Sequence, residues 1–214
     1  MEILYQDNDI LVLNKPSGLP VLPDGWEYDA LYLVKMLEEQ YGKIWIVHRL
    51  DKVTSGVMVY ALTSDAHRKL NIQFEAHQAE KTYHAILVGV PAWDEKTARH
   101  PLRSNVGHKH RSMVDDRSGK PSETSFKVLK RYPLHTLVEA HLLTGRTHQV
   151  RVHAYALGYP ILGDTLYGSL PSDFVSRPAL HSYSLSFTHP VTDSRLTFTA
   201  RYPMDIEHAL KQLS

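Results

Sequence analysis

A polar turn between two apolar segments, within residues 46–60, constrains the fold of this chain more than any other feature. The turn carries the carboxylate of Asp51 between two cations, Arg49 and Lys52. Apolar, β-branched residues on both sides of it predict a strand before and a strand after the turn. Asp51 therefore stands at the margin of a sheet, where a rigid scaffold can present a reactive group, although an aspartate at such a place is often only a turn former.

The rest of the hydrophobic pattern consists mostly of short strands with a few helices between them. We expect a hairpin within 1–13 and strands at 44–47, 57–62, 83–90, 125–131, 136–143, 184–188 and 195–200. Helical periodicity predicts helices at 30–41, over about 14 residues from an N-cap at Thr63, at 147–157, and from Asp205. Strands outnumber helices and the gaps are short, so the pattern predicts the α+β class with a mixed, mainly antiparallel sheet core and flanking helices. No shift in composition marks a boundary, and we expect a single domain over 1–214.

Composition excludes several classes of protein. The chain has no cysteine, which rules out disulfides and thiolate metal sites, and no apolar run near the roughly 20 residues of a membrane span. We therefore expect a cytoplasmic protein without a membrane partner. The net charge is only +1, but residues 99–131 hold nine Lys and Arg against three acids. This basic segment is typical of a phosphate-contacting face and equally of a solvated loop.

Two more segments carry side chains suited to chemistry. In Lys81-Thr82-Tyr83, a tyrosine enters a buried strand, where it can pack at the edge of a core or stack on a planar base. Residues 143–153 place Gly145-Arg146 between a strand and a helix, so that the guanidinium can point into a cleft and pair with a carboxylate. For Arg151 and His153, which can face the interior, an anchoring role is the favoured interpretation.

These three segments, in this order, resemble the sequence blocks of the RluA family of RNA pseudouridine synthases. The match includes His48-Arg49-Leu50-Asp51, with Thr54-Ser55-Gly56 after it, and Gly145-Arg146-Thr147-His148-Gln149. It extends from Asn14-Lys15-Pro16-Ser17-Gly18 to the Gly-Tyr-Pro-Ile-Leu-Gly-Asp run of residues 158–164. The resemblance implies the pseudouridine synthase fold with a central RNA-binding cleft. Family members often carry an N-terminal S4 domain, and we expect the catalytic domain alone here.

The resemblance also implies roles for individual residues. Asp51 is expected to be the catalytic aspartate, Tyr83 to stack on the target base and Arg146 to pair with Asp51. Arg49 is expected to fill the gap left by the flipped nucleotide. We assign further RNA contacts to Lys52, Lys81, His148, Lys109 and Arg111. The expected reaction is an isomerisation of specific uridines in ribosomal RNA, transfer RNA or both, and it needs neither a cofactor nor a metal.

Two other functions are weighed against this one. A non-catalytic RNA-binding protein on the same scaffold has no need for a carboxylate facing phosphates. A metal-dependent hydrolase is suggested by 14 histidines, including His100, His108, His110, His148 and His153. Their spacing matches no helical pair of ligands, and no acidic cluster supports them. We therefore expect an RNA isomerase. No exposed apolar stripe stands out in the sequence, and we expect a monomer.

Overall fold

A computed structural model describes residues 1–23, 31–107 and 111–213. The chain forms two compact units, which we call unit 1 and unit 2. Unit 1 comprises Met1–Lys81 and Ser182–Arg201, and unit 2 comprises Thr82–His181 and Tyr202–Ser214. The boundary falls within two strands, β5 (Glu80–Val88) and β11 (Leu180–Thr188), which each contribute residues to both units.

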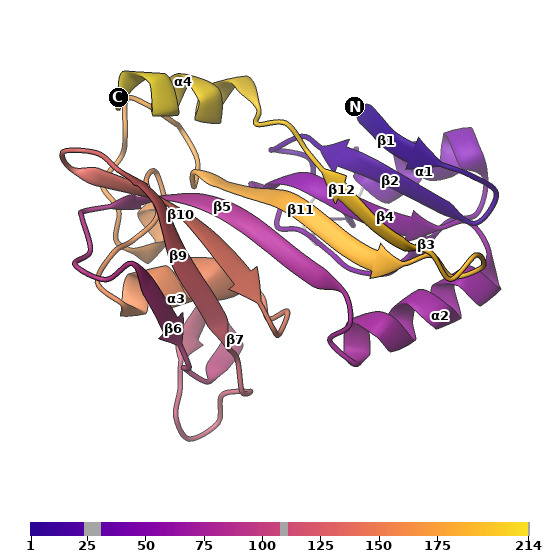
Figure 1. Ribbon diagram of the computed structural model, residues 1–214, viewed down its shortest axis with the longest axis horizontal. Coiled ribbons are helices and arrows are strands. Elements are labelled where there is room, and N and C mark those ends of the chain that lie inside the picture. The colour runs from indigo at the N-terminus through magenta and orange to yellow at the C-terminus, as the bar shows by residue number, and fades with distance from the viewer. Residues whose placement is uncertain (24–30, 108–110, 214) are drawn as a thin grey trace. The chain divides into compact units, whose positions relative to one another are not determined.

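Unit 1 is a sheet with two helices (Figure 1). Its strand order is β1-β2-β4-β11, with β3 beside β4 and β12 beside β11. The pairs β1–β2, β2–β4, β3–β4 and β11–β12 are antiparallel. The bounds are β1 Glu2–Gln6, β2 Ile10–Lys15, α1 Leu33–Tyr41, β3 Trp45–Ile46, β4 Ser55–Ala61, α2 Ser64–Glu75 and β12 Arg195–Thr199.

The core of unit 1 explains why its central strands read as continuous apolar runs. Every residue of β4 is buried, so both faces of that strand are covered. Val57 and Val59 on one face join Leu70 of α2 and Phe187 of β11 in a common hydrophobic cluster. Thr63 caps α2 by accepting a hydrogen bond from the Ala66 backbone N–H at 3.3 Å, as expected from the sequence.

Unit 2 contains an antiparallel sheet in the order β5-β10-β9-β6. The helix α3 packs against β8, β9 and the 3₁₀ turn η1. The bounds are β6 Glu95–Ala98, β7 Leu102–Val106, β8 Arg111–Val114, β9 Thr124–Arg131, β10 His135–Leu142, α3 Gln149–Ala156, η1 Thr165–Tyr167 and α4 Met204–Gln212.

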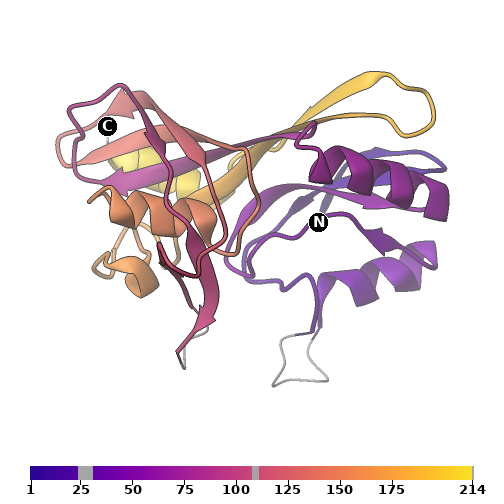
Figure 2. The same cartoon turned by 90° about the horizontal axis from the view of Figure 1, so that it is seen from below.

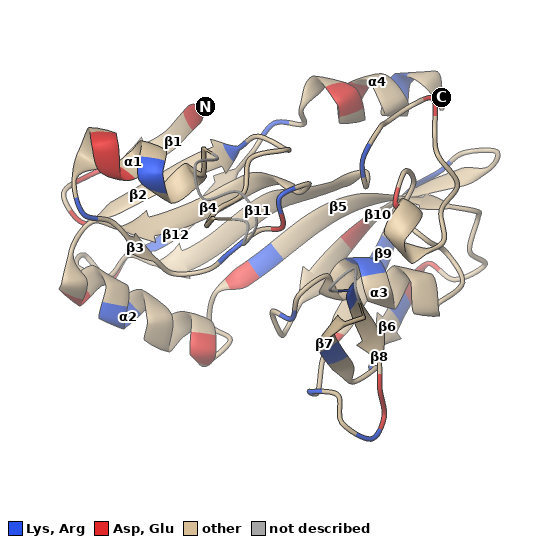
Figure 3. Cartoon of the chain, turned by 180° about the vertical axis from the view of Figure 1, so that it is seen from behind, with Lys and Arg blue, Asp and Glu red and all other residues tan. Residues whose placement is uncertain are grey.

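The strands β7 and β8 pair with each other and form a separate hairpin in the basic segment. Figure 2 shows this hairpin projecting from the four-stranded sheet of unit 2. Lys and Arg recur along the chain around β7 and β8 (Figure 3). The basic segment therefore contains two short strands that the sequence analysis did not place.

The predicted α+β class and the mainly antiparallel sheet are confirmed. The predicted strands and helices are also found, with ends that differ by a few residues. The single domain remains a prediction. Among the described residues, no helix has both the length and the apolar composition that a membrane span requires.

Candidate active site

The Asp51 turn lies in unit 1 between β3 and β4. Its chain reversal is closed by a hydrogen bond from the Thr54 backbone N–H to the Asp51 carbonyl at 3.0 Å. The Asp51 side chain is partly exposed, and β4 begins at Ser55. A carboxylate is thus presented on a tight turn at the start of the most buried strand of the unit.

A clamp formed by Lys15, Ser17 and Gly18 holds the residues that follow Asp51. Lys15 is fully buried, and its ammonium donates to the carbonyls of Pro16 at 2.9 Å, Leu19 at 2.7 Å and Lys52 at 3.2 Å. The Gly18 N–H donates to the same Lys52 carbonyl at 2.8 Å. The Ser17 hydroxyl donates to the Val53 carbonyl at 2.8 Å. Because a buried ammonium is costly unless it is hydrogen-bonded, these contacts fix the path of the turn.

Gly56 allows β4 and β11 to approach closely within unit 1. Its φ is 120°, and a Cβ built on it would lie 2.1 Å from the Ser182 carbonyl oxygen. A side chain at this position would push β11 away or displace the end of the Asp51 turn. The glycine that ends the Thr54-Ser55-Gly56 motif is therefore required by backbone packing.

His48 supports the other end of the turn. Its Nε2 accepts a hydrogen bond from the Val59 backbone N–H at 3.2 Å, and its ring stacks on Phe74 at 5.0 Å. Burial, with a contribution from the Lys81 charge, lowers the pKa of His48 to about 3. The ammonium of Lys81 lies 6.0 Å from the centre of the Phe74 ring. Burial also lowers the pKa of Lys81. His48 is thus a neutral acceptor at physiological pH.

The depressed pKa of His48 predicts a loss of stability in acid. An unfolded histidine titrates near 6.5, whereas folded His48 titrates near 3. Between these values the unfolded state holds a proton that the folded state lacks, so stability falls as pH drops from about 6.5 to about 3, by about 1.4 kcal/mol per pH unit. His48→Gln removes this contribution, and we expect urea unfolding at pH 7, 5.5 and 4.5 to show a flatter pH dependence than wild type. His208→Gln, an exposed histidine on α4, should leave the dependence unchanged; equal slopes for wild type and His48→Gln would contradict the prediction.

Tyr83 lies in unit 2, where β5 pairs with β10. It is 8% exposed and stands opposite Ala140 in the register. The next residue, His84, lies within 3.5 Å of Glu139 and contacts the Tyr202 hydroxyl, which restrains this part of the strand. The aromatic ring of Tyr83 is therefore held in a rigid strand.

Arg146 lies in the loop between β10 and α3, and Gln149 organises that loop. The Gln149 side-chain oxygen accepts from the Arg146 N–H at 3.0 Å and from the Thr144 hydroxyl at 2.7 Å. Its amide nitrogen donates to the Glu123 carbonyl at 2.9 Å and to the Thr124 hydroxyl. The Arg146 side chain is partly exposed, and its Nε donates to the Pro121 carbonyl at 3.4 Å. The predicted strand-to-helix junction at Gly145-Arg146 is confirmed.

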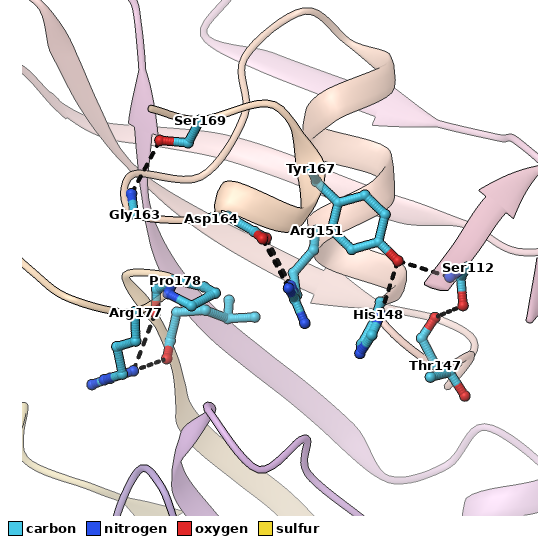
Figure 4. Close-up of polar contacts among 11 residues, drawn as sticks. Ser112, Thr147, His148, Arg151, Gly163, Asp164, Tyr167, Ser169, Arg177 and Pro178 are labelled. Carbon is cyan, nitrogen blue, oxygen red and sulfur yellow. Dashed lines mark hydrogen bonds and ion pairs between the residues drawn. The ribbon is translucent and has the colours of Figure 1, made fainter. Parts of the chain in front are cut away.

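His148 is held at the N-terminus of α3 by a hydrogen-bond chain (Figure 4). It adopts a left-handed conformation with φ 56°. The Tyr167 hydroxyl lies 2.8 Å from its Nδ1 and accepts from the Ser112 N–H at 2.8 Å. The chain joins α3, β8 and η1.

Arg151 and Asp164 form a buried ion pair one turn further along α3 (Figure 4). The Nε and a terminal nitrogen of Arg151 donate to the two Asp164 oxygens at 2.7 and 2.8 Å. The guanidinium also lies over the Tyr167 ring, 5.0 Å from its centre. His153 is fully buried and contacts Thr124 at 2.9 Å. The anchoring interpretation of Arg151 and His153 agrees with these contacts.

The predicted RNA-binding cations are distributed over both units. Arg49 and Lys52 are exposed beside Asp51 in unit 1, and Lys81 is partly buried there. Arg111 is exposed at the start of β8 in unit 2, whereas Lys109 lies outside the described residues.

Asp51 belongs to unit 1, and Tyr83 and Arg146 belong to unit 2. The pairing of Asp51 with Arg146 remains a prediction.

Comparison with known proteins identifies the family. Residues 9–156 match the model of a family described as RNA pseudouridylate synthase, a range that includes Asp51, Tyr83 and Arg146. This chain belongs to the RNA pseudouridylate synthase family. The predicted isomerase class and RNA-modifying function follow from this membership.

Relatives within the RNA pseudouridylate synthase family match nearly the whole chain. The ribosomal large subunit pseudouridine synthase D of Zymomonas mobilis is 36% identical over all of this chain and 73% of its own length. The dual-specificity RNA pseudouridine synthase RluA of Haemophilus influenzae is 38% identical over 94% of this chain and 93% of its own. The structure of human RNA pseudouridylate synthase domain containing 4 matches with a TM-score of 0.82 and 27% identity, covering 99% of this chain and 92% of that one. The resemblance and the fold predicted from the sequence are confirmed.

The sequence analysis missed the residues that position the Asp51 turn. Lys15 and Ser17 entered only as part of a matching motif, and the clamp links Lys15 to Lys52 across 37 positions. The available signal was Lys15 itself, since it ends the strand β2 and stands directly before Pro16 and its turn.

Proposed function

We propose that this pseudouridine synthase isomerises specific uridines in structured ribosomal RNA, transfer RNA or both, with Asp51 as the catalytic residue. The observation that carries the proposal is the family match over residues 9–156, which includes all three proposed catalytic residues. The relatives from Z. mobilis and H. influenzae bear names that refer to the large ribosomal subunit and to dual specificity. The rigid clamp on the Asp51 turn supports a role that requires precise placement.

The reaction breaks the N1–C1′ bond of uridine, turns the uracil and rejoins it through C5. No group is donated and no electron is exchanged, so the chain's own side chains suffice. Asp51 acts on the ribose, by attack at C1′ or by removal of the C2′ proton, and one carboxylate serves either route. Glycoside hydrolases, by contrast, typically use two carboxylates that flank the bond.

Arg146 and Tyr83 complete the proposed catalytic group. A guanidinium beside a carboxylate favours its charged form, and in this proposal Arg146 keeps Asp51 ionised. The Tyr83 ring, held in β5, offers a flat apolar face on which the detached uracil is retained while it rotates. Arg151 is the other guanidinium of the same block, and its fork with Asp164 gives it an anchoring role.

RNA binding must supply the free energy for nucleotide extraction. Removing a base from its stack costs a few kcal/mol, because stacking and pairing are lost. Arg49, exposed at the Asp51 turn, fills the vacancy, and phosphate contacts from Lys52, Lys81, His148, Lys109 and Arg111 add affinity. We place this activity in the cytoplasm and in a monomer.

Mapping of modified uridines tests the proposal directly. Total RNA from cells with and without this protein is compared for pseudouridine at single-nucleotide resolution, and the purified protein is then incubated with unmodified transcripts of the affected RNA. We expect one or more uridines in ribosomal or transfer RNA to lose the modification in cells without the protein and to regain it in vitro. Unchanged maps, together with RNA binding but no product in vitro, would favour the non-catalytic RNA-binding function instead.

A further inference from the structure

Unit 2 contains a hollow of about 390 Å³ beside the Arg146 loop. Its walls come from β7, from the turn that follows β8 and from the loop before α3. The volume lies at the lower end of the range for ligand sites, about 300–1,000 Å³. The polar residues of the lining are Arg103, Ser104, Ser118, Lys120, Arg146 and Thr147. The hollow is therefore large enough for a ligand and is lined by three cations and three hydroxyls.

The lining selects for a negative charge. None of the described residues that line the hollow carries a carboxylate. Asp115, which does not line the hollow, pairs with one of the lining cations, its Oδ2 lying 3.1 Å from the Arg103 Nε. Lys120 and Arg103 are both exposed to solvent, so an anion can reach them from outside. Figure 3 shows the blue segments of β7 and its neighbouring loops in this region.

Asp115 fixes two walls of the hollow at once. Its Oδ1 accepts hydrogen bonds from the backbone N–H groups of Ser118 and Arg117 at 2.9 and 3.0 Å, which hold its pKa below the usual range. The turn is tight, because a Cβ on Gly119 would lie 2.4 Å from the Asp115 carbonyl oxygen. Lys120 is then bonded in both directions to the backbone of Leu102 on β7. The cations of these walls thus project from a fixed backbone.

Ser112 attaches the third wall. Its hydroxyl donates to the Thr147 carbonyl at 2.7 Å and lies 3.3 Å from the Ser104 hydroxyl. Its backbone N–H donates to the Tyr167 hydroxyl. The β7–β8 hairpin and the Arg146 loop are therefore held together before any ligand arrives, which reduces the entropy lost on binding.

We propose that this hollow is a docking site for a backbone phosphodiester of the RNA substrate, with Lys120 and Arg103 as its main contacts. An RNA phosphodiester carries one negative charge and acceptor oxygens, which match the ammonium, the guanidinium and the hydroxyls of the lining. Because Gly145-Arg146-Thr147 forms one wall, a phosphate held here also restrains the loop that carries Arg146. The inference rests on the proposed function for the identity of the RNA.

Salt-dependent binding tests the docking site. The dissociation constant of a substrate stem-loop is measured at several KCl concentrations for wild type, Lys120→Gln and Arg103→Gln. Each variant should bind RNA severalfold more weakly, by a similar factor for different sequences, and each should reduce the slope of log K against log salt by about one. Lys96→Gln, an exposed lysine on β6 in the same unit, is the matched control and should leave both quantities unchanged.

A scan with neutral linkages identifies the phosphate. An uncharged methylphosphonate linkage replaces one phosphodiester of the stem-loop at a time. At one or two positions we expect this replacement to weaken RNA binding by wild type. At the same positions it should not weaken RNA binding by Lys120→Gln any further. Slopes and affinities of both variants equal to those of wild type would overturn the docking site. Binding of inorganic phosphate in the hollow that leaves the affinity for RNA unaffected would overturn it as well. Binding is scored without turnover, so failure of the docking site is distinguishable from failure of the isomerase, which is scored by product formation.

Discussion

Asp51→Asn is expected to abolish pseudouridine formation while RNA binding stays close to that of wild type. Asparagine has the shape of aspartate, so the turn held by Lys15 and Ser17 should keep its path. The amide, however, neither attacks C1′ nor accepts the C2′ proton. We expect single-turnover rates to fall by about a thousandfold or more, which corresponds to about 4 kcal/mol of lost transition-state stabilisation.

The assay compares product formed from one stem-loop with the affinity of the same stem-loop. Asp65→Asn, which neutralises an exposed acid in the first turn of α2, is the matched control and should leave the rate unchanged. Loss of product with retained affinity separates an enzyme from an RNA-binding protein on the same scaffold. A variant Asp51→Asn that converts uridine at the wild-type rate would remove Asp51 from the mechanism.

Elements that depend on neighbouring residues could be predicted from the sequence. The cap at Thr63 needs only the Ala66 N–H three positions later, and the helix begins where the pattern indicated. The strands on both sides of Asp51 follow from their apolar, β-branched residues. The Gly145-Arg146 junction was visible in the same way, because the strand pattern stops and a helical pattern begins within a few residues.

Contacts between distant segments could not be predicted in this way. A lysine is rarely fully buried, so nothing in the local pattern indicated that the Lys15 ammonium binds three carbonyls. The same holds for the hollow of unit 2, whose three walls come from separate parts of the chain. Local composition predicted a basic segment, but the placement of Arg103 and Lys120 around one hollow depends on the Asp115 turn.

Asp164→Asn should destabilise the protein by about 3–5 kcal/mol, because it leaves the Arg151 guanidinium buried without its counter-charge. The two side chains are 6% and 0% exposed, and both hydrogen bonds of the fork are short. For a chain of this size the loss corresponds to a drop in Tm of roughly 6–20 °C. Urea unfolding followed by circular dichroism at pH 7 measures the change.

Glu123→Gln is the matched control for burial, since Glu123 forms the same kind of fork with Arg99 in the same unit. There the arginine side chain is 70% exposed and the glutamate 28%, and water replaces the lost interaction. An exposed pair contributes about 0–1 kcal/mol, so this variant should unfold close to wild type. If the two variants lose equal stability, burial is not what makes the Arg151–Asp164 pair important. If only Asp164→Asn is destabilised, the pair anchors α3 to η1, and through α3 it supports the loop that carries Arg146.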